Sequence, residues 1–361
     1  MIDVGCDAEG CATRQQLPES TVKEPLQLRA QSLGILGGLV LLSLGGGRPA
    51  SLTPGIGLGL EGDKLAPTAV WAHSTPAQVV PVLTIPFEFF KQFIFVTVDV
   101  NDKGPRSFLL DSGASDNTIN LRAGRELGLP LGHVRDLSNA GIGEGKTVES
   151  SAKEVSLRVQ GKQLFSRNIT VLDMAPFEKW IGRPIDGVLG APLLEDYIVQ
   201  IDYTNSVIKL YDPTGYVADD GKKRVIPIRI DGNRPFIEAT VTTLAGNSFD
   251  AKLMIDTGND APLSLNAPFT LKHGLPGVQE TGKNTTTGVA GTSDNVIGHV
   301  KELDIGGIKI PDLVTFFSAA EHGQSASAKY DGLIGNSLLK DFKITFDYSR
   351  KQMILQLSAS N

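Results

Sequence analysis

The sequence predicts a mainly β protein in which two similar barrels follow one another along the chain. The first observation is a repeat: segment 108–113 (FLLDSG) returns as 253–258 (LMIDTG), an offset of 145 residues. At the same offset, segment 186–190 (DGVLG) returns as 331–335 (DGLIG). The second observation is that most other apolar segments are short, β-branched or aromatic, and interrupted by glycine, as in all-β barrels. Solenoid repeats are only ~20–50 residues long, so this offset indicates a domain duplication and a pseudo-two-fold, bilobal molecule.

Length and composition agree with two domains. A chain of 361 residues is long enough for two lobes with cores of their own, and we expect these at 82–214 and 224–361, after a leader and linker at 1–81. The composition, 41% hydrophobic and 20% charged, is that of an ordinary globular protein. A net charge of −6 without a basic cluster gives no electrostatic reason to expect nucleic acid as a partner.

The leader has features of an export signal. Its apolar stretch at 33–44 (LGILGGLVLLSL) is too short to span a bilayer comfortably but has the size of a signal-peptide core. Arg29 precedes this stretch, although acidic residues outnumber basic ones in the leader before it, and a proline-rich linker follows at 45–81. We therefore expect a periplasmic or secreted protein without a stable membrane span in its mature form, or a membrane-attached one if the leader stays uncleaved. The alternative is a disordered tail with a short hydrophobic patch.

The sequence offers no candidate metal or cofactor site. Both cysteines, Cys6 and Cys11, lie in the leader, so the repeated region contains no disulfide and no thiolate ligand. The five histidines lack metal-ligand spacing. Segment 99–104 only faintly resembles a calcium loop, because the terminal glutamate is missing. We expect no cofactor.

Each half is predicted to end in a β-hairpin preceded by a short helix. Segment 342–347 alternates apolar and polar residues with period two, which places Phe342, Ile344 and Phe346 on one buried face. The equivalent segment 198–203 is followed by a turn and a second strand. Before each hairpin, a Leu-Leu pair follows Pro192 or Ser337, which predicts one short helix per half, and Asn336 is a candidate N-cap.

A glycine-rich segment lies in the middle of each half, at 140–145 and 287–292. Glycine permits tight hairpins that bring the backbone close to a ligand, so we interpret both segments as flaps over a substrate cleft. The alternative is a surface hairpin without function, since glycine is common in turns. The candidate flap residues are Gly141, Ile142 and Gly143 in the first half, and Gly288, Val289 and Ala290 in the second.

The strongest candidates for catalysis are Asp111 and Asp256. Each ends an apolar strand and is followed by a hydroxyl residue and a glycine, so its carboxylate is expected at the mouth of a core rather than on a solvated face. In both halves a hydrophobic-hydrophobic-glycine triplet ends 79 residues after the aspartate. The supporting residues of the two loops are Ser112, Gly113, Thr257 and Gly258.

These motifs resemble the retropepsin-like aspartic peptidases of bacteria, with two copies fused in one chain. Segments 85–88 (IPFE) and 101–105 (NDKGP) also resemble that family, and the resemblance covers roughly residues 82–357. It implies two acid-protease barrels in which Asp111 and Asp256 face one another, so that a monomer replaces the homodimer that a single copy requires. It also implies that Ser112 and Thr257 tie the two loops together and that Gly113 and Gly258 let backbone amides approach the carboxylates.

The implied function is that of an aspartic endopeptidase acting on a peptide or protein substrate. Two neighbouring carboxylates cannot both ionise easily, so one can activate water while the other donates a proton. The competing interpretation is a weakly active or inactive peptide-binding protein of the same fold. A third is that each half pairs with its twin in another molecule. The second copy departs from the first, with Asn259-Asp260 in place of Ala114-Ser115, and we interpret Asp260 as a solvated loop residue.

Overall fold

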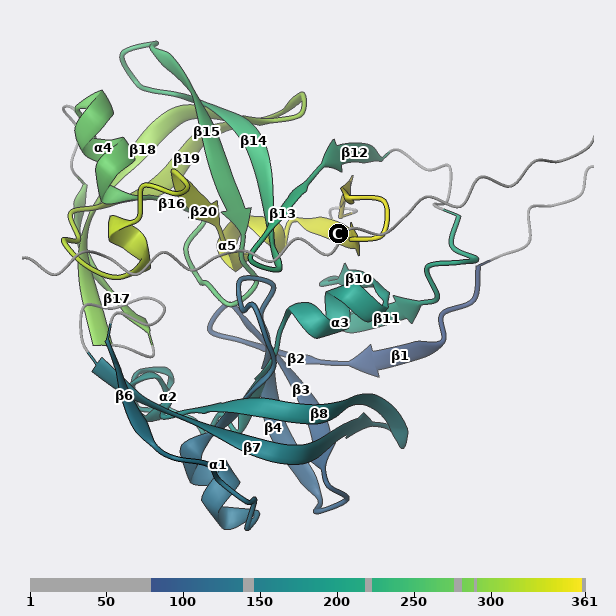
Figure 1. Ribbon diagram of the computed structural model, residues 1–361. Coiled ribbons are helices and arrows are strands. Elements are labelled where there is room, and N and C mark those ends of the chain that lie inside the picture. Colours follow the sequence, from purple (N-terminus) through teal and green to yellow (C-terminus); the bar gives the residue numbers. More distant parts are fainter. Residues whose placement is uncertain (1–78, 139–145, 218–222, 276–280, 289–290, 359–361) are drawn as a thin grey trace, which may run out of the picture. The chain divides into compact units, whose positions relative to one another are not determined.

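The computed structural model describes residues 79–138, 146–217, 223–275, 281–288 and 291–358. These residues belong to one compact unit, 73–361, and confirm the mainly β prediction: two eight-stranded sheets and one six-stranded sheet account for most of them. In Figure 1 the sheet of the first half lies below the six-stranded sheet and the sheet of the second half lies above it.

The sheet of the first half closes on itself. Its strands follow the order β2-β3-β4-β9-β5-β8-β7-β6, and an additional pairing between β3 and β7 completes the barrel. In the strand 93–100, the alternate residues Ile94, Val96, Val98 and Val100 are buried in the main hydrophobic cluster, whereas Phe93 and Phe95 are buried in a second one. The elements of this half are β2 (Glu88–Phe90), β3 (Phe93–Val100), β4 (Pro105–Leu110), β5 (Thr118–Asn120), α1 (Leu121–Glu126), β6 (Arg135–Ser138), β7 (Lys146–Val159), β8 (Lys162–Leu172), α2 (Ala175–Ile181) and β9 (Gly187–Leu189).

The sheet of the second half repeats this arrangement strand by strand. Its order is β13-β14-β15-β20-β16-β19-β18-β17, and the pairing of β14 with β18 closes it as β3 with β7 closes the first. Equivalent sequence segments therefore occupy equivalent strands. The elements are β13 (Arg229–Asp231), β14 (Arg234–Thr242), β15 (Ser248–Ile255), β16 (Leu263–Leu265), α4 (Ala267–His273), β17 (Gly282–Gly288), β18 (Gly291–Ile305), β19 (Ile308–Ser318), the 3-10 turn η1 (Gln324–Ala326) and β20 (Gly332–Ile334).

The six-stranded sheet joins the two halves. It contains both predicted hairpins, and its two central strands, β10 and β21, come one from each half. Gln200 lies opposite Thr345 there, and their side chains hydrogen-bond at 3.2 Å across a separation of 145 residues. A residue that meets its own repeat lies beside a local two-fold axis. The elements are β1 (Leu83–Pro86), α3 (Ala191–Asp196), β10 (Ile198–Asp202), β11 (Val207–Tyr211), β12 (Arg224–Pro227), α5 (Asn336–Leu339), β21 (Phe342–Asp347) and β22 (Gln352–Leu357).

One hydrophobic cluster runs through all three sheets. Phe108 of the first barrel, Leu253 of the second and Ile201 of the shared sheet all belong to it and are fully buried. Phe342, Ile344 and Phe346 are buried as predicted.

Three helices were not predicted, and one predicted cap is wrong. The unpredicted helices are α1, α2 and α4, with six or seven residues each, too short to show a helical period. Asn336 is the first residue of α5, whose N-cap is Gly335. Its side chain instead donates hydrogen bonds to the carbonyl oxygens of Thr257 (2.6 Å) and Gln92 (2.7 Å), so it holds loops together rather than capping its own helix.

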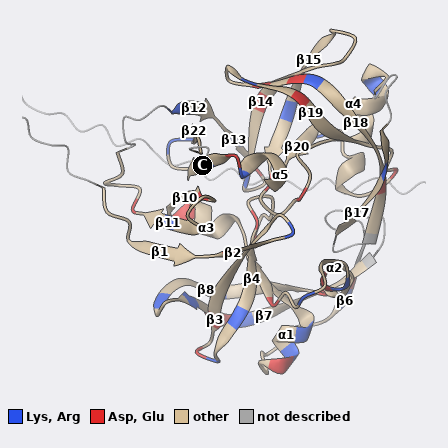
Figure 2. Ribbon diagram, turned by 180° about the vertical axis from the view of Figure 1, so that it is seen from behind, with Lys and Arg blue, Asp and Glu red and all other residues tan. Residues whose placement is uncertain are grey.

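Several predictions lie outside the described residues: the leader with its apolar stretch and cysteines, and the flap residues Gly141, Ile142, Gly143, Val289 and Ala290. The lobe boundaries stay predictions. In the described part of the chain, no helix is long and apolar enough to cross a bilayer. Figure 2 shows Lys and Arg interspersed with Asp and Glu over both barrels.

Candidate active site

Each candidate aspartate lies at the end of a strand that is paired with a parallel neighbouring strand. Strand β4 pairs in parallel with β9, and the amide of Asp111 donates to the carbonyl of Leu189 at 2.9 Å. Strand β15 pairs in the same way with β20, and the amide of Asp256 donates to Ile334, also at 2.9 Å. The repeated hydrophobic-hydrophobic-glycine triplets are therefore the strands that hold the two aspartates in position.

The glycine that ends each triplet leaves room for the aspartate loop. A Cβ atom at Gly190 would lie 2.8 Å from the carbonyl oxygen of Ala114, and one at Gly335 would lie 2.6 Å from that of Asn259. Real Cβ atoms do not approach backbone this closely, so any larger residue would push the loop away. The steric requirement explains why both triplets end in glycine.

Ser112 and Thr257 connect the two aspartate loops. The Ser112 hydroxyl donates to the carbonyl of Ile255 at 2.7 Å and accepts from the amide of Thr257 at 3.0 Å. The Thr257 hydroxyl donates to the carbonyl of Leu110 at 3.1 Å and accepts from the amide of Ser112 at 2.9 Å. Both residues are fully buried, so these four bonds fix the relative position of the loops in a place that water does not reach.

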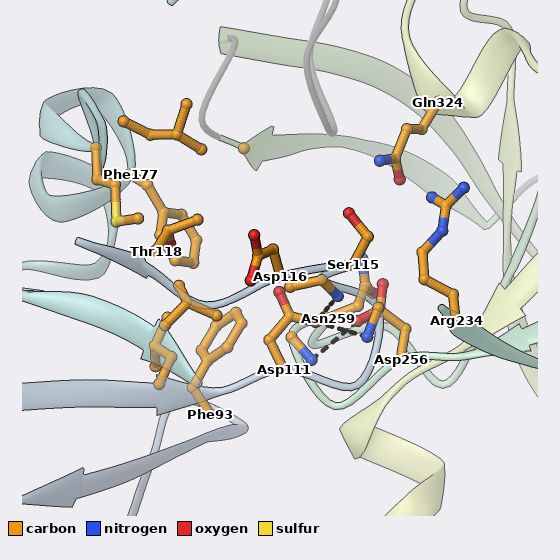
Figure 3. A pocket seen from close by; sticks show the side chains of 18 of the residues that line it. Phe93, Asp111, Ser115, Asp116, Thr118, Phe177, Arg234, Asp256, Asn259 and Gln324 are labelled. Carbon is orange, nitrogen blue, oxygen red and sulfur yellow. Dashed lines mark hydrogen bonds between the residues drawn. The ribbon is translucent and has the colours of Figure 1, made fainter. Parts of the chain in front are cut away.

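The two carboxyl groups lie against one another. A hydrogen bond joins Asp111 to Asp256. Each glycine faces the aspartate of the other half: a Cβ atom at Gly113 would lie 2.6 Å from Cγ of Asp256, and one at Gly258 would collide with Cγ of Asp111. The structure thus brings together all six residues predicted for the aspartate loops, and Figure 3 shows the two carboxyls side by side on the cavity floor.

The dyad is electrostatically unequal. Burial raises the pKa of both carboxyls, and the neighbouring charge of Asp111 raises that of Asp256 further. Oδ1 of Asp111 accepts two backbone hydrogen bonds, from Gly113 (2.8 Å) and Ala114 (3.0 Å), which favour its ionised form. Oδ1 of Asp256 accepts one, from Gly258 at 2.9 Å. These hydrogen bonds favour the ionised form of Asp111, and the two carboxyls titrate together as one pair.

The dyad opens into a cavity of about 340 Å³ lined by both barrels. Gly288, the one candidate flap residue among those described, lines it together with Thr286 and Thr287 of β17. Strand β17 forms a hairpin with β18 that pairs as far as Gly288 and Gly291. Figures 1 and 2 both show β6 of the first half beside β17 of the second.

The interpretation of Asp260 as a solvated loop residue is wrong. The residue is half-buried, lines the cavity, and has its pKa raised by burial. It follows Asn259, whose side chain accepts the Ala261 amide at 2.8 Å and turns the chain inward. Among the described residues no group of three or more His, Cys, Asp and Glu is arranged to hold a metal ion.

Several residues that line the cavity carried no signal in the sequence. Phe93 and Arg234 each begin a strand after a two-residue turn, and Phe177 lies on an unpredicted helix. Phe93 and Arg234 do not align at the constant offset of 145 residues. They match only when the hairpins of the two halves are compared with one another.

The first half of the chain is similar to a known protein family. A family model described as aspartyl protease matches residues 96–193, a segment that contains Asp111 and ends beyond Gly190. No curated protein matches the chain. The match supports a protease-like function.

Proposed function

We propose that the protein is an aspartic endopeptidase whose catalytic dyad is Asp111 and Asp256, one from each lobe. The observation that carries the proposal is the hydrogen bond between two buried carboxyls on the floor of a cavity that both barrels line. Peptide hydrolysis needs one group that accepts a proton from water and one that donates a proton to the substrate, and a dyad holding a single proton supplies both.

The unequal environments suggest which aspartate has which role. Ionised Asp111 accepts a proton from a water molecule while the oxygen of that water attacks the scissile carbonyl carbon. Protonated Asp256 donates its proton to the carbonyl oxygen, which gives a neutral tetrahedral intermediate. The proton now held by Asp111 passes to the amine as the C–N bond breaks, and the proton of the intermediate returns to Asp256. The two products are a carboxylic acid and an amine, and no cofactor takes part.

The cavity supports the remaining requirements. Its lining contains 23 residues from both barrels, so an extended peptide between them would be held on two sides and shielded from bulk water. Strand β17 is the edge strand of its sheet and residues 286–288 line the cavity, which supports a role for this hairpin in binding such a peptide as an added strand. We extend this role to the first glycine-rich segment by analogy.

Export from the cytoplasm is part of the proposal. Both cysteines precede residue 79, so the barrels contain no thiol that an oxidising compartment could modify. The mature chain is expected to begin between residues 45 and 82. N-terminal sequencing of protein from the native host checks this, and an intact Met1 on cytoplasmic protein would contradict it.

The dyad is tested by mutation in the full chain. Asp111→Asn and Asp256→Asn should each lower the cleavage rate of an unfolded protein substrate by at least ~10²-fold, because either change removes one proton-transfer group. The double variant should lose little more, since the two groups act as a unit. Wild-type cleavage should be inhibited by pepstatin, and circular dichroism of the variants should match that of the wild type.

The alternative is a peptide-binding protein with little or no hydrolysis. It predicts that wild-type protein binds peptides without cleaving them at any pH between 3 and 8, a range that spans the ordinary and the raised pKa of a carboxyl. A single variant with near-wild-type turnover would equally contradict the shared dyad.

A further inference from the structure

The two ends of the cavity differ in chemistry. Figure 3 shows Phe93 and Phe177 on one side of the two aspartates and Arg234 and Gln324 on the other. The rings of Phe93 and Phe177 meet edge to face with centroids 5.5 Å apart. Leu109, Leu172, Met174 and Val188 pack with these rings and also line the cavity, while Thr118 and Asp116 add polar groups on the same side of the dyad.

Phe93 and Arg234 occupy equivalent places in the two barrels. Phe93 closes the β2–β3 turn by pairing with Phe90, and Arg234 closes the β13–β14 turn by pairing with Asp231. The local two-fold axis therefore relates the two positions, one on each side of the dyad. Where the first barrel presents an aromatic ring to the cavity, the second presents a guanidinium group.

Within the described part of the chain, the guanidinium group of Arg234 has a hydrogen-bond donor without an acceptor. Its Nε atom is buried without a hydrogen-bond partner, and no described residue forms an ion pair with it. Its positive charge nevertheless reaches the dyad, where it lowers the pKa of both Asp111 and Asp256. A buried donor without an acceptor is costly, and a carboxylate that accepts hydrogen bonds from a guanidinium group removes that cost.

Two acidic residues that line the cavity, Asp116 and Asp260, do not form an ion pair with the guanidinium group of Arg234. Asp116 lies on the side of Asp111 away from Arg234 in Figure 3, and its Oδ1 accepts the amide of Asn117 at 2.8 Å. Asp260 also lines the cavity, but burial raises its pKa and so keeps it uncharged to a higher pH than an exposed aspartate. Neither acid is ion-paired with Arg234.

We propose that Arg234 binds a carboxylate of the substrate, so that the protein prefers peptides with an apolar or aromatic residue on one side of the scissile bond and an acidic residue on the other. This inference rests on the proposed peptidase function and names its substrate class. The carboxylate is either an acidic side chain or the free C-terminus of a peptide, since both offer two oxygens to a guanidinium group.

The test uses matched peptides that contain one Phe in an otherwise small, uncharged sequence with blocked termini. Glu, Gln or Lys is placed in turn at each of the first three positions on either side of Phe, and a parallel Gln series has a free C-terminal carboxylate. At one position the wild type should cleave the Glu peptide with a kcat/KM about tenfold or more above that of the Gln peptide, as a charge-assisted hydrogen bond provides. A preference for the free-acid series instead would identify the C-terminus as the source of the carboxylate.

Two variants of the full chain decide the role of Arg234. Arg234→Gln should bring the Glu-to-Gln ratio close to one, and Arg234→Glu should shift the preference to the Lys peptide. Arg229→Gln is the matched control, because Arg229 is an exposed arginine on the same hairpin that does not line the cavity, and the ratio should stay at its wild-type value. A wild-type ratio near one at every position, or a ratio that Arg234→Gln leaves unchanged, would overturn the proposal.

Binding separates this proposal from the peptidase function. The same peptides, fluorescently labelled, are titrated with wild-type protein and with Arg234→Gln. Tighter binding of the carboxylate-bearing peptide that disappears in the variant supports the role of Arg234 even if no peptide is cleaved. Equal binding of Glu and Gln peptides by the wild type counts against it even if both are cleaved.

Discussion

Asp256 couples the chemistry of the dyad to the stability of the fold. Its pKa lies well above 3.8 because the group is buried beside another carboxyl. The folded protein therefore binds a proton that the unfolded chain releases near pH 4. The stabilisation from this proton is fully present below the unfolded pKa and is lost as the pH rises through the folded one.

Asp256→Asn should remove this pH dependence. Asparagine has the shape of the protonated acid and carries no charge, so the variant escapes the cost of ionising a buried group. We expect the free energy of unfolding of the wild type, relative to the variant, to fall as the pH rises from 4 to 8, until the variant is the more stable protein. Urea unfolding of both proteins at several pH values measures the difference, in which contributions from carboxyls outside the dyad cancel.

An exposed aspartate provides the control for that measurement. Asp136 is an exposed residue of β6, and Asp136→Asn shows how much the loss of a single carboxyl outside the buried pair changes the unfolding free energy under the same conditions. A constant difference between the wild type and Asp256→Asn across the pH range would mean that the two carboxyls of the dyad do not share a proton in the folded protein.

At the scale of elements, the sequence predicts what depends on local pattern. The strands that end in Asp111 and Asp256 are apolar runs that stop at a polar turn, and β21 alternates with period two, so their character is visible in the residues themselves. Because the motifs occur twice, each element can be predicted from two segments of the sequence. Both halves predict a hairpin at the equivalent place, which made the two hairpins predictable.

Elements that depend on tertiary contacts escaped prediction. Helix α1 begins where the Asn120 side chain accepts the Arg122 amide at 3.2 Å, and six residues are too few for a helical period to show. Asn336 looked like a cap because its type favours caps, but partners from distant loops compete for its side chain. The burial of Asp260 and the exposure of Arg234 to the cavity follow from how two barrels meet, which no local pattern records.

At the scale of the molecule, the shared sheet should make the two halves unfold together. Ile344 of β21 lies opposite Ile201 of β10, both side chains are fully buried, and both belong to the cluster that also fills the two barrels. Neither half could separate without exposing the central pair of strands to water. Unfolding of described residues from either half is therefore expected to be a single transition.

The fluorescence of Trp180 reports the unfolding of the first half while a substitution is made in the second half. It stacks on Phe177 in the first half, and the chain has only one other tryptophan, Trp71, which a Trp71→Phe background removes. In that background Ile344→Ala, a change in the second half, should cost about 2–5 kcal/mol as a buried large-to-small substitution. If the halves unfold together, the urea midpoint followed by Trp180 fluorescence should fall as far as the midpoint followed by circular dichroism. Val225→Ala, an exposed position on β12 of the same sheet, should move neither midpoint by much. An unchanged Trp180 midpoint in Ile344→Ala would show that the first half keeps its fold alone, and that the shared sheet connects two independently stable barrels.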